Sequence, residues 1–174
     1  MLLFEALEVR NEYRRKRTVL EDLLEGEDSG IGSLGYRNSS PDKYRETEEF
    51  AEERERLSEE LRSLRKKEVK LNQEIQKANL ETELTVNDET MTLSEALERR
   101  KALNSKLGDL VSQLDNSKTE GVIYKEDRDI VISPDRPFNQ LWEEYEKSVV
   151  KFRTLQTKIH KLNHTVEINW NYEE

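Results

Sequence analysis

The sequence predicts an all-α protein: an elongated antiparallel coiled-coil or four-helix arrangement formed by a duplicated helical hairpin, with small β-hairpins in the connections. Three observations lead to this prediction: a highly charged composition, long helical periodicity and an internal repeat. Only 33% of the 174 residues are hydrophobic and 39% are charged. Such a composition suits long helices that bury narrow apolar stripes better than it suits a large compact core.

Two long segments carry the strongest helical periodicity. From Phe50 to Ala78, alternating steps of four and three residues meet apolar side chains, with Arg54 and Glu68 as the exceptions. The segment from Leu141 to Val166 has the same spacing, interrupted only by Ser148. An apolar stripe of this kind between charged residues is typical of a coiled-coil seam.

Two shorter helical segments reveal the repeat. Leu3–Leu24 aligns without gaps to Leu93–Leu114, and nine of the 22 aligned positions are identical. The long segments align as well, with Phe50 on Leu141 and Ile75 on Val166. We therefore predict one domain, 1–174, that contains an internal repeat, 1–81 and 91–174, joined by a linker, 82–90.

Capping and turn signals set the expected boundaries of the helices. Thr92-Leu93-Ser94-Glu95 has the spacing of a capping box, so we expect a helix to start at Thr92. Ser40-Pro41-Asp42 and Ser133-Pro134-Asp135 each predict the start of a long helix, with Ser or Asp as the N-cap and Pro in the first turn.

The connections between the helices differ from one another. The segment GVIYKEDRDIVI, Gly121–Ile132, has two β-rich runs around a charged turn and predicts a small hairpin. In the linker, Asn87-Asp88 predicts either the turn of a second short hairpin or a simple loop.

The segment GIGSLG, Gly30–Gly35, has the glycine spacing of a dinucleotide-binding loop. That loop requires a preceding strand and a following helix. Here a predicted helix precedes the glycines, and Glu25, Glu27 and Asp28 would repel phosphate. We therefore interpret the segment as a turn in which glycine supplies positive φ, and we expect no cofactor.

Cysteine content and charge narrow the possible classes of protein. The chain has no cysteine and a formal net charge of -9. The lack of cysteine excludes disulfides and cysteine-ligated metals. Neither a signal peptide nor an apolar run of membrane length is visible. We predict a cytoplasmic protein without a membrane span, and nucleic acid is not its expected partner because an acidic chain repels it.

The two histidines, His160 and His164, lie four residues apart in the last predicted helix, with Glu167 three residues further on. Two imidazoles at this spacing can chelate a metal ion. The apolar seam places them on the outward face, so we interpret them as solvated surface residues and expect no bound metal.

The one basic cluster lies in the first helix and is formed by Arg10, Arg14, Arg15, Lys16 and Arg17. It is a candidate for binding nucleic acid or an acidic partner. The alternative is ion pairing with a neighbouring antiparallel helix, where countercharge is available from Glu52, Glu53, Glu55, Glu59 and Glu60. Near the end of the chain, Trp170 has no obvious place in a core and is a candidate for contact with the bundle or with a second subunit.

Part of the sequence resembles a known family. LSEALERRKALNSKLGDL, the segment from Tyr124 to Ile132 and the ending VEINWNYEE resemble the septicolysin-like family of uncharacterised bacterial helical proteins. The matching residues are Glu95, Ala96, Leu97, Arg100, Asn169 and Trp170. The chain departs from the family in the Gly-rich loop of its first half and at Leu80, after Asn79. The resemblance implies an α-helical fold of unknown biochemical role, and the family label suggests a haemolysin.

Together these features predict a non-enzymatic structural or protein-interaction protein that forms homo-oligomers. Long helices with narrow apolar stripes often complete their core against another chain. A nucleic-acid-binding protein that uses the basic cluster is the alternative, and a membrane-active toxin is the second alternative.

Overall fold

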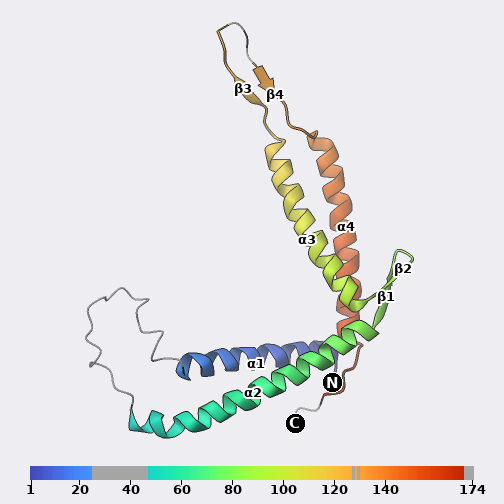
Figure 1. The fold of residues 1–174 in the computed structure, drawn as a ribbon. Coiled ribbons are helices and arrows are strands. Elements are labelled where there is room, and N and C mark those ends of the chain that lie inside the picture. Colours follow the sequence, from blue (N-terminus) through green and yellow to red (C-terminus); the bar gives the residue numbers. More distant parts are fainter. Residues whose placement is uncertain (25–46, 127, 129, 171–174) are drawn as a thin grey trace, which may run out of the picture. The chain divides into compact units, whose positions relative to one another are not determined.

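A computed structural model describes residues 1–24, 47–126, 128 and 130–170. The described elements, shown in Figure 1, are α1 (Leu3–Leu24), α2 (Glu48–Glu81), β1 (Glu83–Val86), β2 (Glu89–Thr92), α3 (Leu93–Asn116), β3 (Gly121–Ile123), β4 (Ile130–Ile132) and α4 (Phe138–Asn163). The strands form two separate antiparallel pairs, β1–β2 and β3–β4. The protein is therefore mostly helical with two small β-hairpins, as predicted. The predicted GIGSLG turn and the predicted helix start at Ser40-Pro41-Asp42 lie outside the described residues.

The chain divides into two compact units. The first contains Met1–Ala78 together with Val166–Glu174, and the second contains Asn79–Thr165. In each unit two helices pair, α1 with α2 and α3 with α4. The prediction of a single domain stays a prediction.

In the first unit, α1 and α2 pack antiparallel through the seam that the periodicity predicts. Leu20 of α1 packs with Leu61 and Leu64 of α2, and Tyr13, Leu24 and Leu57 cover this cluster. The other apolar seam residues in the C-terminal half of α2 are also buried: Leu71, Ile75 and Ala78. Glu68 is buried in the same seam, so the charged interruption of the sequence pattern faces the neighbouring helix rather than solvent.

The two ends of the chain meet in the first unit. The backbone N–H of Leu3 donates to the carbonyl of Val166 at 2.8 Å, and that of Ile168 donates to the carbonyl of Met1 at 2.8 Å. Leu2 and Glu167 form an antiparallel bridge between these contacts. The prediction that the last helix continues to Val166 is wrong, because α4 ends at Asn163 and the following backbone pairs with the start of the chain.

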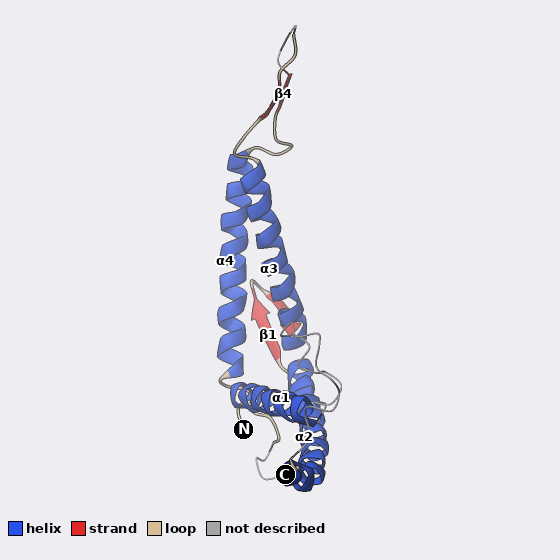
Figure 2. Ribbon diagram, turned by 90° about the vertical axis from the view of Figure 1, so that its left-hand side faces the viewer, coloured by secondary structure: helices blue, strands red, loops and turns tan. Residues whose placement is uncertain are grey.

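In the second unit, α3 and α4 lie side by side, as Figures 1 and 2 show. Leu110 and Leu114 of α3 pack against Leu141 of α4, with Tyr145 alongside. Further along the pair, Arg100 donates to Gln156. These pairings run in opposite directions along the two helices, so α3 and α4 are antiparallel.

The linker forms the β1–β2 hairpin, the first of its two predicted alternatives. Asn87 and Asp88 both have positive φ, 50° and 65°, as the tight turn of a two-residue hairpin requires. The strands pair Leu84 with Met91, and both side chains are buried. The predicted capping box follows directly. Thr92 Oγ1 accepts from the Glu95 N–H at 3.2 Å, and the Thr92 N–H donates to the Glu95 carboxylate at 2.7 Å.

The starts of α1 and α3 make equivalent hydrogen bonds, each with a different segment of the chain. The N–H of Leu93 donates to the Thr82 carbonyl at 2.7 Å, as the N–H of Leu3 does to Val166. The Leu2 N–H donates to the Glu5 carboxylate at 2.8 Å, as the Thr92 N–H does to Glu95. These contacts match Val166 with Thr82, one heptad away from the sequence alignment that placed Val166 on Ile75.

Candidate functional site

The β3–β4 hairpin carries apolar side chains on both of its faces. Its register pairs Gly121 with Ile132, Val122 with Val131 and Ile123 with Ile130. Since successive residues of a strand point to opposite faces, one face carries Ile123, Ile130 and Ile132, and the other carries Val122 and Val131. The predicted hairpin is confirmed, but neither of its faces is polar.

These side chains are largely uncovered within the chain. Their exposed fractions are 42% for Val122, 47% for Ile123, 53% for Val131 and 54% for Ile132. An isolated two-stranded hairpin is marginally stable in water. The unpaired edges of such a hairpin also offer backbone groups to another strand. The hairpin, which Figure 1 shows extending from the ends of α3 and α4, thus has the properties of a docking element.

The first turns of α4 add exposed aromatic rings in the same unit. The rings of Phe138 and Trp142 stack with their planes 7° apart and their centroids 6.3 Å apart. Trp142 also contacts Tyr145 at a centroid distance of 5.6 Å. Phe138 and Trp142 are 41% and 45% exposed. Exposed aromatic side chains of this kind are enriched where proteins bind one another.

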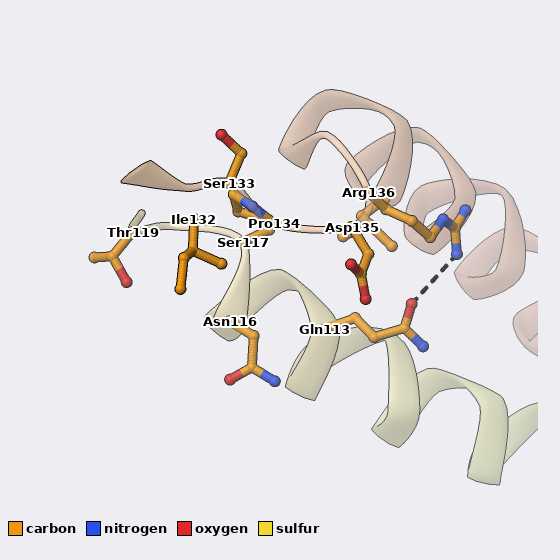
Figure 3. Close-up of a pocket in the computed structure, with 10 residues that line it drawn as sticks. Gln113, Asn116, Ser117, Thr119, Ile132, Ser133, Pro134, Asp135 and Arg136 are labelled. Atoms are coloured by element: carbon orange, nitrogen blue, oxygen red, sulfur yellow. Dashed lines mark hydrogen bonds between the residues drawn. The ribbon is translucent and has the colours of Figure 1, made fainter. Parts of the chain in front are cut away.

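A cavity of about 430 Å³ lies at the base of the hairpin (Figure 3). Ile132 contributes both to the exposed strand β4 and to the cavity wall, so the cavity is continuous with the apolar surface of the hairpin. The wall is formed by Gln113, Asn116, Ser117, Thr119, Ile132, Ser133, Pro134, Asp135, Arg136 and Leu141.

One side of this cavity is formed by residues 133–136, which lie in a loop before α4 and not in the helix as predicted. The prediction that Ser133-Pro134-Asp135 caps the helix is wrong: α4 begins at Phe138, and the N-cap residue is Pro137, which provides no side-chain cap. A residue before proline is disfavoured in helical conformation, so Pro137 keeps Arg136 out of the helix. Asp135 therefore lies in the loop, and its carboxylate is not used as a cap.

An ion-pair network holds this loop against the helices. Arg136 donates to Glu144 of α4 at 2.6 Å and to Gln113 of α3 at 3.3 Å. Lys106 of α3 lies 2.7 Å from the same Glu144 carboxylate. Hydrogen bonds from Arg136, and then from Lys106, lower the pKa of Glu144 to about 2. The network fixes the cavity wall that Asp135 and Arg136 provide.

The basic cluster of α1 is largely occupied by ion pairs with α2. Arg14 Nε lies 3.2 Å from one Glu68 oxygen, and Arg17 Nη1 lies 2.6 Å from the other. Lys16 pairs with Glu60 at 2.5 Å. Of the glutamates expected to supply countercharge, Glu60 does so, whereas Glu53 and Glu59 pair within α2 with Arg56 and Arg62. The main partner, Glu68, is buried, and the sequence analysis did not assign it this role.

The other predicted interaction residues belong to the first unit, whereas the hairpin belongs to the second. Arg15 is exposed, and Arg10 is half-buried. Burial, and then the neighbouring Arg14 charge, lowers the pKa of Arg10, against the opposing effect of Glu68. Trp170 is half-buried in the first unit, and its indole N–H is buried without a hydrogen-bond partner among the described residues.

The two histidines do not share a helix. His160 lies within α4, is exposed and is hydrogen-bonded to Gln156 at 2.8 Å, whereas His164 is the C-cap residue that follows Asn163, the last residue of the helix. Within residues 1–24, 47–126 and 130–170, no group of three or more His, Asp or Glu side chains is placed to hold a metal ion. No helix in this described part is both long enough and apolar enough to cross a membrane.

Sequence reasoning missed the contributions of Asp135, Phe138 and Trp142. A signal for the aromatic pair was present, because Phe138 and Trp142 lie four residues apart and outside the predicted stripe of Leu141 and Tyr145. For Asp135 the signal was Pro137, which separates it from the helix that it was expected to cap.

The fold and the site together define a mostly helical protein whose paired helices α3 and α4 carry an exposed apolar β-hairpin. The chain belongs to DUF6847, a family of unknown function, whose model matches residues 28–168. A crystal structure of a functionally unknown conserved protein from Corynebacterium diphtheriae has a similar fold. Its TM-score is 0.67 at 22% sequence identity, over 97% of this chain and 99% of that one. No curated protein matches the chain significantly. These comparisons give no support to the resemblance to the septicolysin-like family.

Proposed function

We propose that this protein is a non-enzymatic interaction protein that presents the β3–β4 hairpin to a partner protein. The observation that carries the proposal is the exposure of aliphatic side chains on both faces of the hairpin. Full burial of an aliphatic side chain stabilises by about 1.5–3 kcal/mol, and side chains that are already about half covered gain only part of this when a partner covers them. The aromatic rings of Phe138 and Trp142 on α4 add further exposed apolar surface in the same unit.

The alternatives have less support. For nucleic-acid binding, the relevant side chains are the basic cluster of α1, and Arg14, Lys16 and Arg17 are already paired with glutamates. For a membrane-active toxin, the support is the family resemblance seen in the sequence. Leakage of dye from liposomes tests that second alternative directly.

The proposal also includes the predicted internal repeat, coiled-coil packing, self-association and cellular location. The backbone contacts shared by the starts of α1 and α3 support an internal repeat, in the register that matches Thr82 with Val166. Coiled-coil packing of the long helices, self-association into a homo-oligomer and a cytoplasmic location are further parts of the proposal. Light scattering on the purified protein tests self-association.

Matched variants test the docking role of the hairpin. Val122→Thr with Val131→Thr makes one face of the hairpin polar and keeps β-branched side chains, so the strands are retained. The control is Val111→Thr, which changes a similarly exposed valine on α3. We expect a partner that is captured from native lysate by the wild-type protein and by the control, and that is lost with the double variant. Equal capture by all three proteins would contradict the proposal.

A further inference from the structure

The cavity at the base of the β3–β4 hairpin contains a carboxylate that has no positive partner among the described residues. Figure 3 shows the side chain of Asp135 directed toward the Gln113 side of the cavity. The exposed side chain of Asp135 makes no hydrogen bond or ion pair with any described residue, and no helix N-terminus uses it as a cap. Its charge is therefore open to a ligand in the cavity.

The neighbouring cations are already paired. Arg136 and Lys106 both bind Glu144, and Lys118 pairs with Asp115 at 2.5 Å. Glu120 does not line the cavity, but among the described residues it accepts a hydrogen bond only from the neutral hydroxyl of Ser133, which does. These three cations stand against four carboxylates, Glu144, Asp115, Asp135 and Glu120, so the groups in and beside the cavity carry one excess negative charge, which favours a positively charged ligand.

The walls indicate what kind of cation fits. Ile132, Pro134 and Leu141 supply apolar surface, while Gln113, Ser117 and Thr119 supply amide and hydroxyl groups. Lysine and arginine combine an aliphatic stem with a charged end, and they bury the stem while the end finds polar partners. A metal ion would make no use of the apolar wall, and an anion would be repelled by Asp135.

We propose that this cavity receives a lysine or arginine side chain of the partner protein, with its stem against Ile132, Pro134 and Leu141 and its charge on Asp135. The inference rests on the proposed function, since Ile132 joins the cavity to the surface that the partner covers. A segment that adds as a strand along the hairpin carries side chains at every second position toward one face. One basic residue in such a segment reaches the cavity.

A short peptide tests the inference without the natural partner. The probe is the blocked pentapeptide Val-Thr-Lys-Thr-Val, and its matched control replaces lysine by norleucine, which has a similar aliphatic stem and no charge. Binding is followed by NMR on the full chain. The signals are the backbone amides of Gln113, Asn116, Ser117 and Thr119 and the side-chain amides of Gln113 and Asn116. We expect the lysine peptide to shift these signals, and the norleucine peptide to bind about tenfold more weakly or worse, because the charge-assisted contact is lost.

Two variants separate a local contact from the general attraction of an acidic protein. Asp135→Asn removes the carboxylate of the cavity and should weaken binding of the lysine peptide about tenfold. Asp109→Asn makes the same change in net charge on an exposed part of α3 that does not line the cavity and should have little effect. Equal weakening by both variants, equal binding of both peptides, or no shift with either peptide would overturn the inference.

The two proposals fail in different ways. Capture of a partner that depends on Val122 and Val131 but is unchanged by Asp135→Asn would overturn the inference and leave the proposed function intact. Peptide binding that depends on Asp135, together with capture that is insensitive to the hairpin variants, would overturn the proposed function and the assignment of the basic side chain to the hairpin's partner, and would leave the cavity as a site for a basic side chain.

Discussion

Glu68, buried in the seam of α2, accepts a 2.6 Å hydrogen bond from Nη1 of Arg17 in α1. Arg14 donates to the other oxygen of the same carboxylate at 3.2 Å. The apolar seam between the two helices therefore contains an ionic contact whose acceptor is fully enclosed and whose donors are partly exposed. Such a contact helps to fix the register of two helices, because a shifted pairing would leave the carboxylate buried and unpaired.

Replacing Glu68 by alanine should destabilise the first unit by about 2–3 kcal/mol, between the effects typical of exposed and of fully buried ion pairs. The reason is that Arg14 and Arg17 lose their shared acceptor while part of their surface stays buried. Urea unfolding followed by circular dichroism measures the change. The matched control, Glu60→Ala, removes the partly exposed partner of Lys16 and should cost less than about 1 kcal/mol. Similar losses in the two variants would contradict this account of Glu68.

The turn of the β1–β2 hairpin should depend on residues that tolerate positive φ. Asp88 has a φ of 65°, which a β-branched side chain adopts only with strain. Asp88→Val should therefore cost about 1–2 kcal/mol in unfolding free energy, whereas Asp88→Asn should be close to neutral because asparagine accepts this conformation. Thermal unfolding compares the two variants. An Asp88→Val variant as stable as the wild type would show that the turn differs from the one described.

The Glu144 network should make the stability of the folded state depend on pH in the acidic range. The folded pKa of about 2 lies below the ordinary value of 4.5, so the network stabilises the folded state above pH 4.5 and loses this effect as the pH falls through about 2. The difference in stability between wild type and Glu144→Gln should therefore shrink between pH 4.5 and pH 2. Glu143→Gln changes a neighbouring glutamate with only a 3.6 Å contact to Lys147 and is the control. A difference that stays constant over this range, or a Glu144 carboxyl that titrates near 4.5 by NMR, would be inconsistent with the network.

The hairpin itself should contribute little to the stability of the helices. Because Val122 and Val131 are exposed, the double threonine variant should unfold within about 0.5 kcal/mol of wild type. Leu155→Ala, at a buried position of α4, should cost about 2–5 kcal/mol. Urea unfolding distinguishes these outcomes. A strongly destabilised double variant would mean that the hairpin packs on the helices, and its loss of binding would then have no bearing on docking.

The elements that were predictable from the sequence are those determined by local chemistry. The seam of α2 follows from its apolar spacing, the start of α3 from the capping box of Thr92 and Glu95, and the β3–β4 hairpin from its β-branched runs. What the sequence did not predict depends on residues far apart in the chain. The end of α4 is set by backbone pairing of Val166 with Leu3, and the acceptor for Arg14 and Arg17 is determined by which residue of α2 lies opposite them.

The candidate site was predictable only in part. The hairpin was expected, but its exposure was not, because a continuous apolar run does not say whether another element covers it. Ser133 or Asp135 was expected to serve as the helix cap, and Asp135 became a candidate ligand contact only because α4 starts after Pro137. Both results depend on the three-dimensional arrangement of α3, the hairpin and α4.

The most direct test of the central claim is site-specific photo-crosslinking from the hairpin in native lysate. A photoreactive amino acid replaces Val131 in one variant and Val69 of α2 in another. The two valines are similarly exposed. The account predicts a discrete crosslinked product with another protein from position 131 and none of the same mass from position 69. A product of twice the chain mass, 20.6 kDa, would identify the partner as a second copy. Absence of any discrete product from position 131, or the same product from both positions, would contradict the claim that the hairpin is the docking element.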